Sequence, residues 1–153
     1  MSRTFPSARF ARCRWLLLAA CAVLAAAQPS AQIQADEALA RAGQALEAGD
    51  ANALLSGAAE RIEVVIFEQG GRYRQAQAAH VLRDFFRRHP PERVAFSERS
   101  TSDEGRTAIG RYWTREGGTP LSVRLVHQQR GRGGEWQLVG IRIERPSMIR
   151  TGY

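Results

Sequence analysis

The stretch that decides the fold runs from Gly70 to Pro91 and reads GGRYRQAQAAHVLRDFFRRHPP. Gly70-Gly71 predicts a tight turn, and residues 74–89 predict one amphipathic helix. Pro90 ends this helix because proline has no amide hydrogen to donate and disfavours a helical residue before it. The side chains that share one stripe of the helix are Ala78, Ala79, Leu82, Phe85, Phe86 and His89. Such a stripe must be buried, and the segments around it predict the sheet that buries it.

Strands with alternating apolar residues flank this helix. Residues 61–67 precede it, with Ile62, Val64 and Ile66 on one face, and Arg72-Tyr73 can pair back briefly. Polar or glycine-rich turns separate four later strands, which predicts an antiparallel meander. These strands are expected at residues 93–99, 106–115, 119–129 and 135–145.

Two helices open the domain, the first capped by Asp36 and the second, at residues 51–55, capped by Asp50 after Gly49. Two features together resemble a family of small exported bacterial proteins, domain-of-unknown-function family 4783. They are this pair of helices joined by Gly-Asp and the stretch 70–91. The order of elements over residues 35–145 resembles the nuclear-transport-factor-2-like, or cystatin-like, cone. The resemblance implies an α+β fold: a bent antiparallel sheet of five to six strands wrapped around an N-terminal helix pair and one central helix. It implies export and no particular reaction.

Residues 1–32 predict an export signal that is removed. Arg3, Arg9, Arg12 and Arg14 form a basic start, Trp15–Ala27 is apolar, and the exit offers small-residue cleavage sites at Ala25 and Ala27 or at Ser30-Ala31-Gln32. The apolar run is shorter than the roughly 20 residues of a membrane span. An uncleaved anchor is one alternative. Another is a lipoprotein, since the run that ends at Cys21 matches a lipobox and would attach the chain to a membrane. Residues 33–146 would then form the mature domain, with residues 147–153 as a frayed tail.

Composition restricts the chemistry of the mature domain. Cys13 and Cys21 lie in the signal, so disulfides, thiol chemistry and cysteine-bound metals are not expected beyond it. Removal of the signal leaves 18 arginines among 15 acidic residues, scattered rather than clustered, which does not favour nucleic-acid binding. We find no phosphate loop, no dinucleotide fingerprint, no Ser-His-Asp pattern and no metal-ligand spacing, and therefore expect no cofactor and no metal.

The last two predicted strands indicate an apolar interior. Leu121, Val123 and Leu125 share one face, as do Val139, Ile141 and Ile143, while Arg124, Arg142 and Glu144 form a charged outer face. The same alternation along the strand predicts that His127 points inward. It lies near the end of its strand, however, where we expect the sheet to fray toward solvent. Glu63 would face inward only in the less apolar register of its strand. The residues predicted to line the cone are Leu82, Phe85, Phe86, Leu125, His127 and Ile141.

Aromatic residues are assigned mainly to packing. Adjacent Tyr112 and Trp113 must point to opposite faces of one strand, and Trp136 is expected to plug one end of the cone. Because no acid or base with an orienting partner is evident, we assign no catalytic residue. The sequence favours a non-catalytic exported module, periplasmic or extracellular, that takes a small apolar ligand or a protein partner, with a homodimer through the open sheet face as one form. The alternative is a cone-fold enzyme of isomerase or dehydratase type acting on a small apolar substrate.

Overall fold

The computed structural model describes residues 31–102, 105–131 and 134–146, with side chains from Ile33 onward. Residues 1–30 of the predicted signal, which include Cys21 and the cleavage site at Ala25 and Ala27, and the tail after residue 146 lie outside the described residues. The last two residues of the predicted signal, Ala31 and Gln32, are described and begin α1. The elements are α1 (Ala31–Ala48), α2 (Ala51–Leu55), β1 (Ala58–Ile66), β2 (Gln69–Arg74), α3 (Gln75–Arg88), β3 (Pro91–Ser102), β4 (Gly105–Thr114), β5 (Leu121–Gln129) and β6 (Trp136–Glu144).

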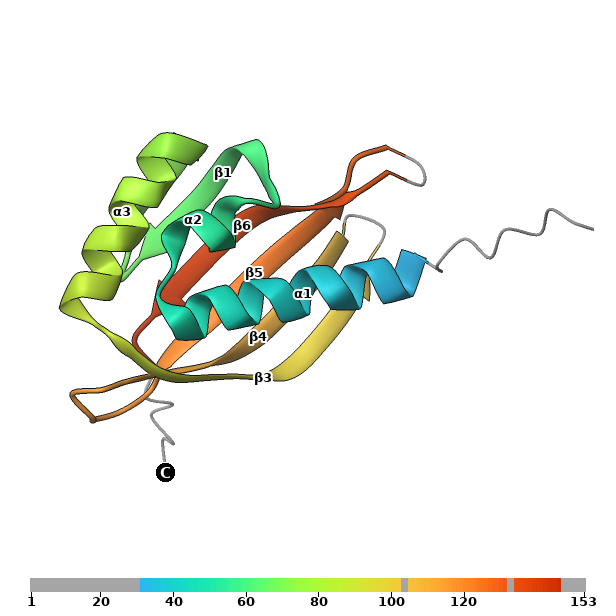
Figure 1. Ribbon diagram of the computed structural model, residues 1–153. Coiled ribbons are helices and arrows are strands. Elements are labelled where there is room, and N and C mark those ends of the chain that lie inside the picture. The colour runs from blue at the N-terminus through green and yellow to red at the C-terminus, as the bar shows by residue number, and fades with distance from the viewer. Residues whose placement is uncertain (1–30, 103–104, 132–133, 147–153) are drawn as a thin grey trace, which may run out of the picture.

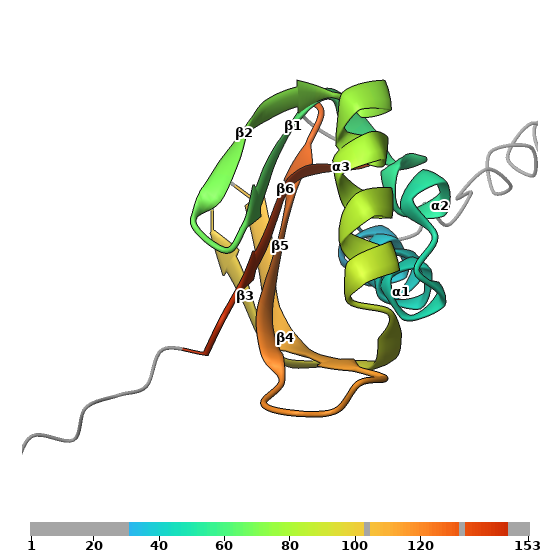
Figure 2. The ribbon, with the colours of Figure 1, turned by 90° about the vertical axis from the view of Figure 1, so that its left-hand side faces the viewer.

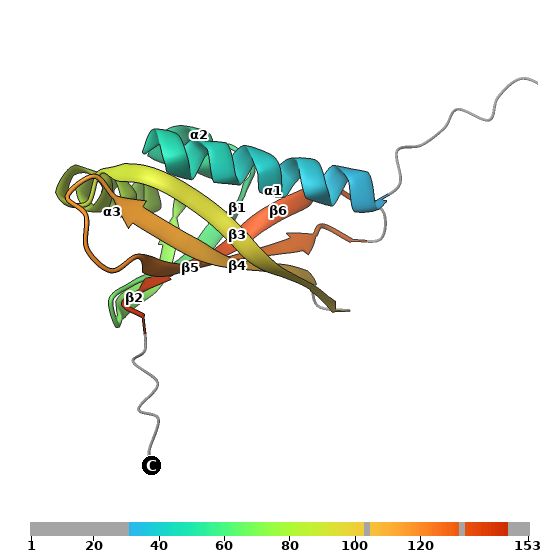
Figure 3. The ribbon, with the colours of Figure 1, turned by 90° about the horizontal axis from the view of Figure 1, so that it is seen from below.

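Six strands form one bent sheet in the order β2-β1-β6-β5-β4-β3, and the helices cover one of its faces (Figures 1 and 2). Figure 3 shows the same two layers from below, with α1 lying across the sheet. The α+β architecture is therefore confirmed. The expectation of a wholly antiparallel sheet is wrong at one pair, because β1 and β6 run parallel. The physical reason is the path of α3, which carries the chain from the β1–β2 hairpin to the far edge, so that the meander returns β6 beside β1.

The start of α1 differs from the expectation. The helix begins at Ala31, so Asp36 lies inside it and is not its N-cap. Ala35 is 3% exposed, and its burial against the sheet explains why the helix extends upstream of Asp36. Asp50 caps α2 as predicted, since its Oδ1 accepts hydrogen bonds from the amides of Asn52 and Ala53 at 2.9 and 3.0 Å.

The turn between β1 and β2 is also displaced from the predicted position. Gly70-Gly71 lies within β2, and the chain turns at Phe67 and Glu68, whose φ angles are 53° and 77°. Two-residue hairpin turns need positive φ values, which non-glycine residues adopt only at a cost. Packing offsets that cost, because the Phe67 ring meets the rings of Phe85 and His89 at centroid distances of 6.1 and 5.4 Å.

Five of the six residues of the predicted stripe pack on α3 as expected, whereas α3 ends at Arg88 and His89 is its partly buried C-cap. Ala78, Ala79, Leu82, Phe85 and Phe86 are all buried against the inner face of the sheet. Arg74 stands at the N-cap position, and the Gln77 side chain accepts a hydrogen bond from its amide at 3.4 Å. At the other end, the amide of His89 donates to the carbonyl of Phe85 at 2.8 Å, before the two prolines.

A β-bulge in β6 decides which of its residues face the core. Val126 pairs with Gly140 while His127 pairs with Leu138, so Val139 is the extra residue. The bulge reverses the alternation, and Leu138, 2% exposed, takes the core position that parity predicted for Val139. The inward prediction for Val139 is therefore wrong, whereas Ile141 and Ile143 are buried as expected.

Candidate ligand site at the mouth of the cone

The side chains predicted to line the cone are all buried, but most of them pack against one another. Leu82, Phe85, Phe86, Leu125 and Ile141 belong to the continuous hydrophobic core that joins α3 to the sheet. None of these side chains borders the three pockets described below, whose walls lie at the end of the cone beneath α1. A ligand among these core residues stays a prediction.

His127 is the member of this set that does border pockets. It is 5% exposed, so the expectation that its strand end frays toward solvent is wrong. The physical reason is the length of α1, whose residues Ala35, Ala38 and Leu39 share pocket walls with His127 and cover the end of β5. Burial lowers the pKa of His127 to about 4, so the imidazole is neutral at neutral pH. Its ring makes no hydrogen bond to any residue of the described part of the chain.

Two small pockets of about 40 Å³ each border His127. One lies between α1 and the strands β3 and β4, and Asp36, Arg99 and Arg106 contribute to it. The other lies between α1, α2 and β6, and Trp136 contributes to it. Each volume exceeds the roughly 10–15 Å³ that a water molecule needs. The neutral imidazole therefore has space beside it for water or for the end of a ligand.

An ion pair connects α1 to the sheet at this end of the cone. The Nη1 of Arg106 on β4 lies 3.1 Å from the Oδ1 of Asp36 on α1. The same guanidinium lies over the Trp136 ring, 5.6 Å from its centroid. Since the Asp36 side chain is 60% exposed, the pair contributes little to stability, about 1 kcal/mol or less. The two contacts show that the first half of α1, β4 and the indole lie side by side at this end of the cone.

The largest of the three pockets is an open cleft of about 340 Å³. Its walls come from residues 34–41 of α1, the junction of α2 and β1, and the start of β6. Its polar side chains belong to Gln34, Glu37 and Arg41 on α1, Ser56 after α2, and Glu135 and Gln137 beside Trp136. The sequence singled out Trp136 as a plug for one end of the cone and did not indicate the rest of this wall, because polar residues on three separate segments carry no common motif.

The aromatic pair on β4 lies as predicted. Tyr112 is fully buried, and its hydroxyl donates to the carbonyl of His89 at 2.6 Å. Burial raises the pKa of this hydroxyl, which therefore stays protonated. Trp113 points to the other face, where it is partly exposed and the Arg93 guanidinium lies 5.0 Å from its ring centroid.

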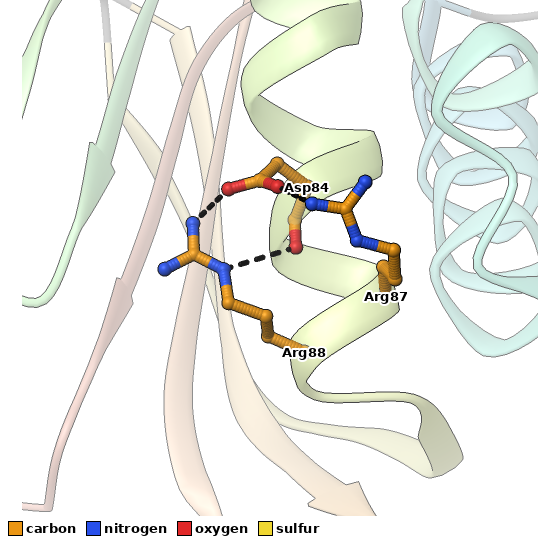
Figure 4. A network of polar contacts seen from close by, with 3 residues as sticks. All are labelled: Asp84, Arg87 and Arg88. Carbon is orange, nitrogen blue, oxygen red and sulfur yellow. Dashed lines mark hydrogen bonds and ion pairs between the residues drawn. The ribbon is translucent and has the colours of Figure 1, made fainter.

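Two charged clusters lie away from the cleft and have structural explanations. On the outer face, Arg142 pairs with Glu63 at 3.4 Å and with Glu144 at 3.2 Å, so the predicted charged face is confirmed and Glu63 points outward. On α3, Asp84 accepts hydrogen bonds from both Arg87 and Arg88 (Figure 4). These arginines occupy the last turn of the helix, where positive charge offsets the helix dipole.

Two further kinds of site, for a metal ion and for a membrane, concern the described residues 31–102, 105–131 and 134–146. Among those residues, no cluster of three or more His, Cys, Asp or Glu side chains could hold a metal ion. No helix there combines the length and apolar character needed to cross a membrane.

Comparison with known proteins places the fold. A family model described as "Domain of unknown function (DUF4783)" matches residues 39–144. The crystal structure of a DUF4783 family protein from Bacteroides ovatus matches with a TM-score of 0.63 and 17% identity, covering 70% of this chain and 94% of that one. An NTF2-like protein of unknown function from Shewanella baltica has a TM-score of 0.56 and 13% identity, covering 78% and 99%.

An uncharacterized cystatin fold protein from Novosphingobium aromaticivorans matches with a TM-score of 0.54 and 14% identity, covering 71% of this chain and 96% of that one. At such identities, the likeness to these structures shows the fold alone. No curated protein matches the chain.

Proposed function

The chain belongs to the DUF4783 family, and on that premise we propose that it is an exported, non-catalytic binding module whose ligand lies in the cleft beside Trp136. The observation that supports this proposal is the composition of the cleft. Its volume of about 340 Å³ falls at the lower end of the roughly 300–1,000 Å³ typical of ligand pockets. Polar groups converge on it from three segments of the chain, while the neighbouring interior is filled by core side chains.

A binding role fits these side chains better than catalysis does. A general base works best when its pKa lies near the working pH, and it needs a partner that orients it. His127 has a pKa of about 4, and no residue of the described ranges orients its ring. The alternative of a cone-fold enzyme rests on one observation, the position of His127 between two small pockets that adjoin α1.

Export is the second part of the proposal, and the N-terminal sequence supports it. Cleavage between Ala27 and Gln32 would leave Gln34, Glu37 and Arg41, which border the cleft, in the mature protein. The intact mass of the protein recovered from the periplasm tests this part. A mature N-terminus in that interval is expected, whereas a lipidated Cys21 or an unprocessed chain would contradict it.

Native mass spectrometry of the protein purified from its own periplasm tests the binding site. The parent is expected to retain a ligand mass that Trp136→Ala loses. Trp113→Ala is the matched control, because it removes the same side chain from the opposite, outer face of the sheet and should retain the ligand. A ligand that persists in folded Trp136→Ala would refute the cleft as its site. A parent that stays bare after incubation with periplasmic extract would refute the binding function.

The enzyme alternative is tested by complementation of a strain that lacks the gene. If His127→Ala still folds and still binds the ligand but no longer restores the phenotype, the result would favour the enzyme. The same assay on the Glu63→Gln variant serves as its control, since Glu63 lies on the outer face and is 52% exposed.

A further inference from the structure

We propose that the ligand of this cleft is a saccharide, bound as a neutral polyol with one sugar ring against Trp136. This inference rests on the proposed function and names the chemical class that the cleft recognises. It departs from the apolar ligand that the sequence favoured, because the walls of the cleft are mainly polar whereas the apolar residues are packed in the core.

The first argument is the mixture of donors and acceptors along the walls. The carboxylates of Glu37 and Glu135 accept hydrogen bonds, the Arg41 guanidinium donates them, and the amides of Gln34 and Gln137 do both. Within the part of the chain that the structure describes, the carboxylate and amide groups of these residues make no hydrogen bond to the protein. Sugar hydroxyls both donate and accept, so one sugar unit can satisfy all three kinds of group.

The second argument is the charge of the cleft. Two carboxylates and one guanidinium line it, and Arg41 stands one helical turn after Glu37 on the same face of α1. An anionic ligand would meet Glu37 and Glu135, and a cationic ligand would meet Arg41. A neutral ligand meets no like charge, and its hydroxyls still form charge-assisted hydrogen bonds with all three residues.

The third argument is that neighbouring residues already contact the Trp136 ring before any ligand binds. Trp136 is partly buried at the start of β6, and Arg106 lies over its ring at 5.6 Å. Asp36 holds that arginine from α1 at 3.1 Å. An indole held in this way offers an apolar surface for the C–H groups of a sugar ring, at little further cost in side-chain ordering. The ring and the polar groups together match the two kinds of surface that a pyranose presents.

The experiment uses the processed protein and follows intrinsic tryptophan fluorescence during titration with maltotriose, cellotriose and the N-acetylglucosamine trimer. At least one of these neutral oligosaccharides is expected to bind. Trp136→Ala should weaken that binding about tenfold or more, as truncation of an aromatic anchor does. Trp113→Ala should leave the affinity unchanged, and calorimetry supplies the readout for both tryptophan variants.

A second variant keeps the test decisive if Trp136→Ala does not fold. Glu37 is exposed on α1, so Glu37→Ala should fold normally and still weaken saccharide binding. Spermidine and decanoate, titrated in parallel, represent cationic and apolar ligands. If either binds in place of the sugars and Trp136→Ala removes its binding, the saccharide inference is wrong and the proposed function stands. If Glu37→Ala and Trp136→Ala bind every probe as the parent does, the cleft is not the site and both proposals fail.

Discussion

Replacing His127 should flatten the pH dependence of stability. The pKa of this buried histidine is about 4 in the folded protein, against about 6.5 for a histidine in an unfolded chain. Between these values the unfolded state binds a proton that the folded state does not, so the free energy of unfolding rises with pH. Over the full pH range this linkage changes the free energy of unfolding by about 3 kcal/mol. About 2 kcal/mol of that free energy is lost when the pH falls from 7 to 4.5.

The measurement is urea unfolding at a series of pH values from 4.5 to 7.5, followed by tryptophan fluorescence. The charged groups in the pockets beside His127 are Asp36 and Arg41 on α1, Arg99 on β3 and Arg106 on β4, and they are the same in parent and variant. The difference between the two curves therefore reports His127 itself. His127→Leu removes the titrating group while it keeps a side chain of similar size.

The matched control is His80→Leu, because His80 is exposed on α3. The control should follow the parent curve, whereas His127→Leu should lose about 2 kcal/mol less than the parent on acidification to pH 4.5. Parallel curves for the parent and His127→Leu would refute the reasoning. They would mean that α1 does not bury the imidazole, and the assignment of α1 as the cover of the cone mouth would fail with it.

Three further substitutions test the packing. Phe85→Ala should cost about 3–5 kcal/mol of unfolding free energy, since Phe85 is 2% exposed; a melting temperature within a degree or two of the parent would contradict the assignment. Tyr112→Phe should cost about 1–3 kcal/mol in urea unfolding because the carbonyl of His89 loses its donor, and an unchanged midpoint would contradict that hydrogen bond. Gly110→Ala should cost about 1–3 kcal/mol or more, because its Cβ would lie 2.8 Å from the Cα of Phe96; unchanged amide exchange in β3 and β4 would contradict this close approach.

The sequence by itself determined the features that depend on local periodicity. The helical stripe through Leu82, Phe85 and Phe86 follows from a repeat of 3.6 residues, and each of these side chains is buried. The opposite orientations of Tyr112 and Trp113 follow from the two-residue repeat of a strand. These regularities are properties of the backbone, so they hold whatever the segment packs against.

Tertiary structure decided the features that depend on a second segment. Strict alternation along the strand predicted Val139 in the core. A bulge forms where β6 pairs with β5, and its one extra residue reverses the alternation. The chain turns at Phe67 although Gly70-Gly71 is the stronger turn signal, because contacts of the Phe67 ring with α3 and His89 offset its unfavourable φ.

The site shows the same dependence most clearly. Burial beneath α1, which crosses the end of its strand, lowers the pKa of His127, whereas the strand alone indicated a solvated position. Around Trp136, the cleft takes its walls from α1, the α2–β1 junction and β6, which are far apart along the chain. Only folding brings them together, because burial and the shape of a cleft depend on distances in space, whereas a sequence pattern records only spacing along the backbone.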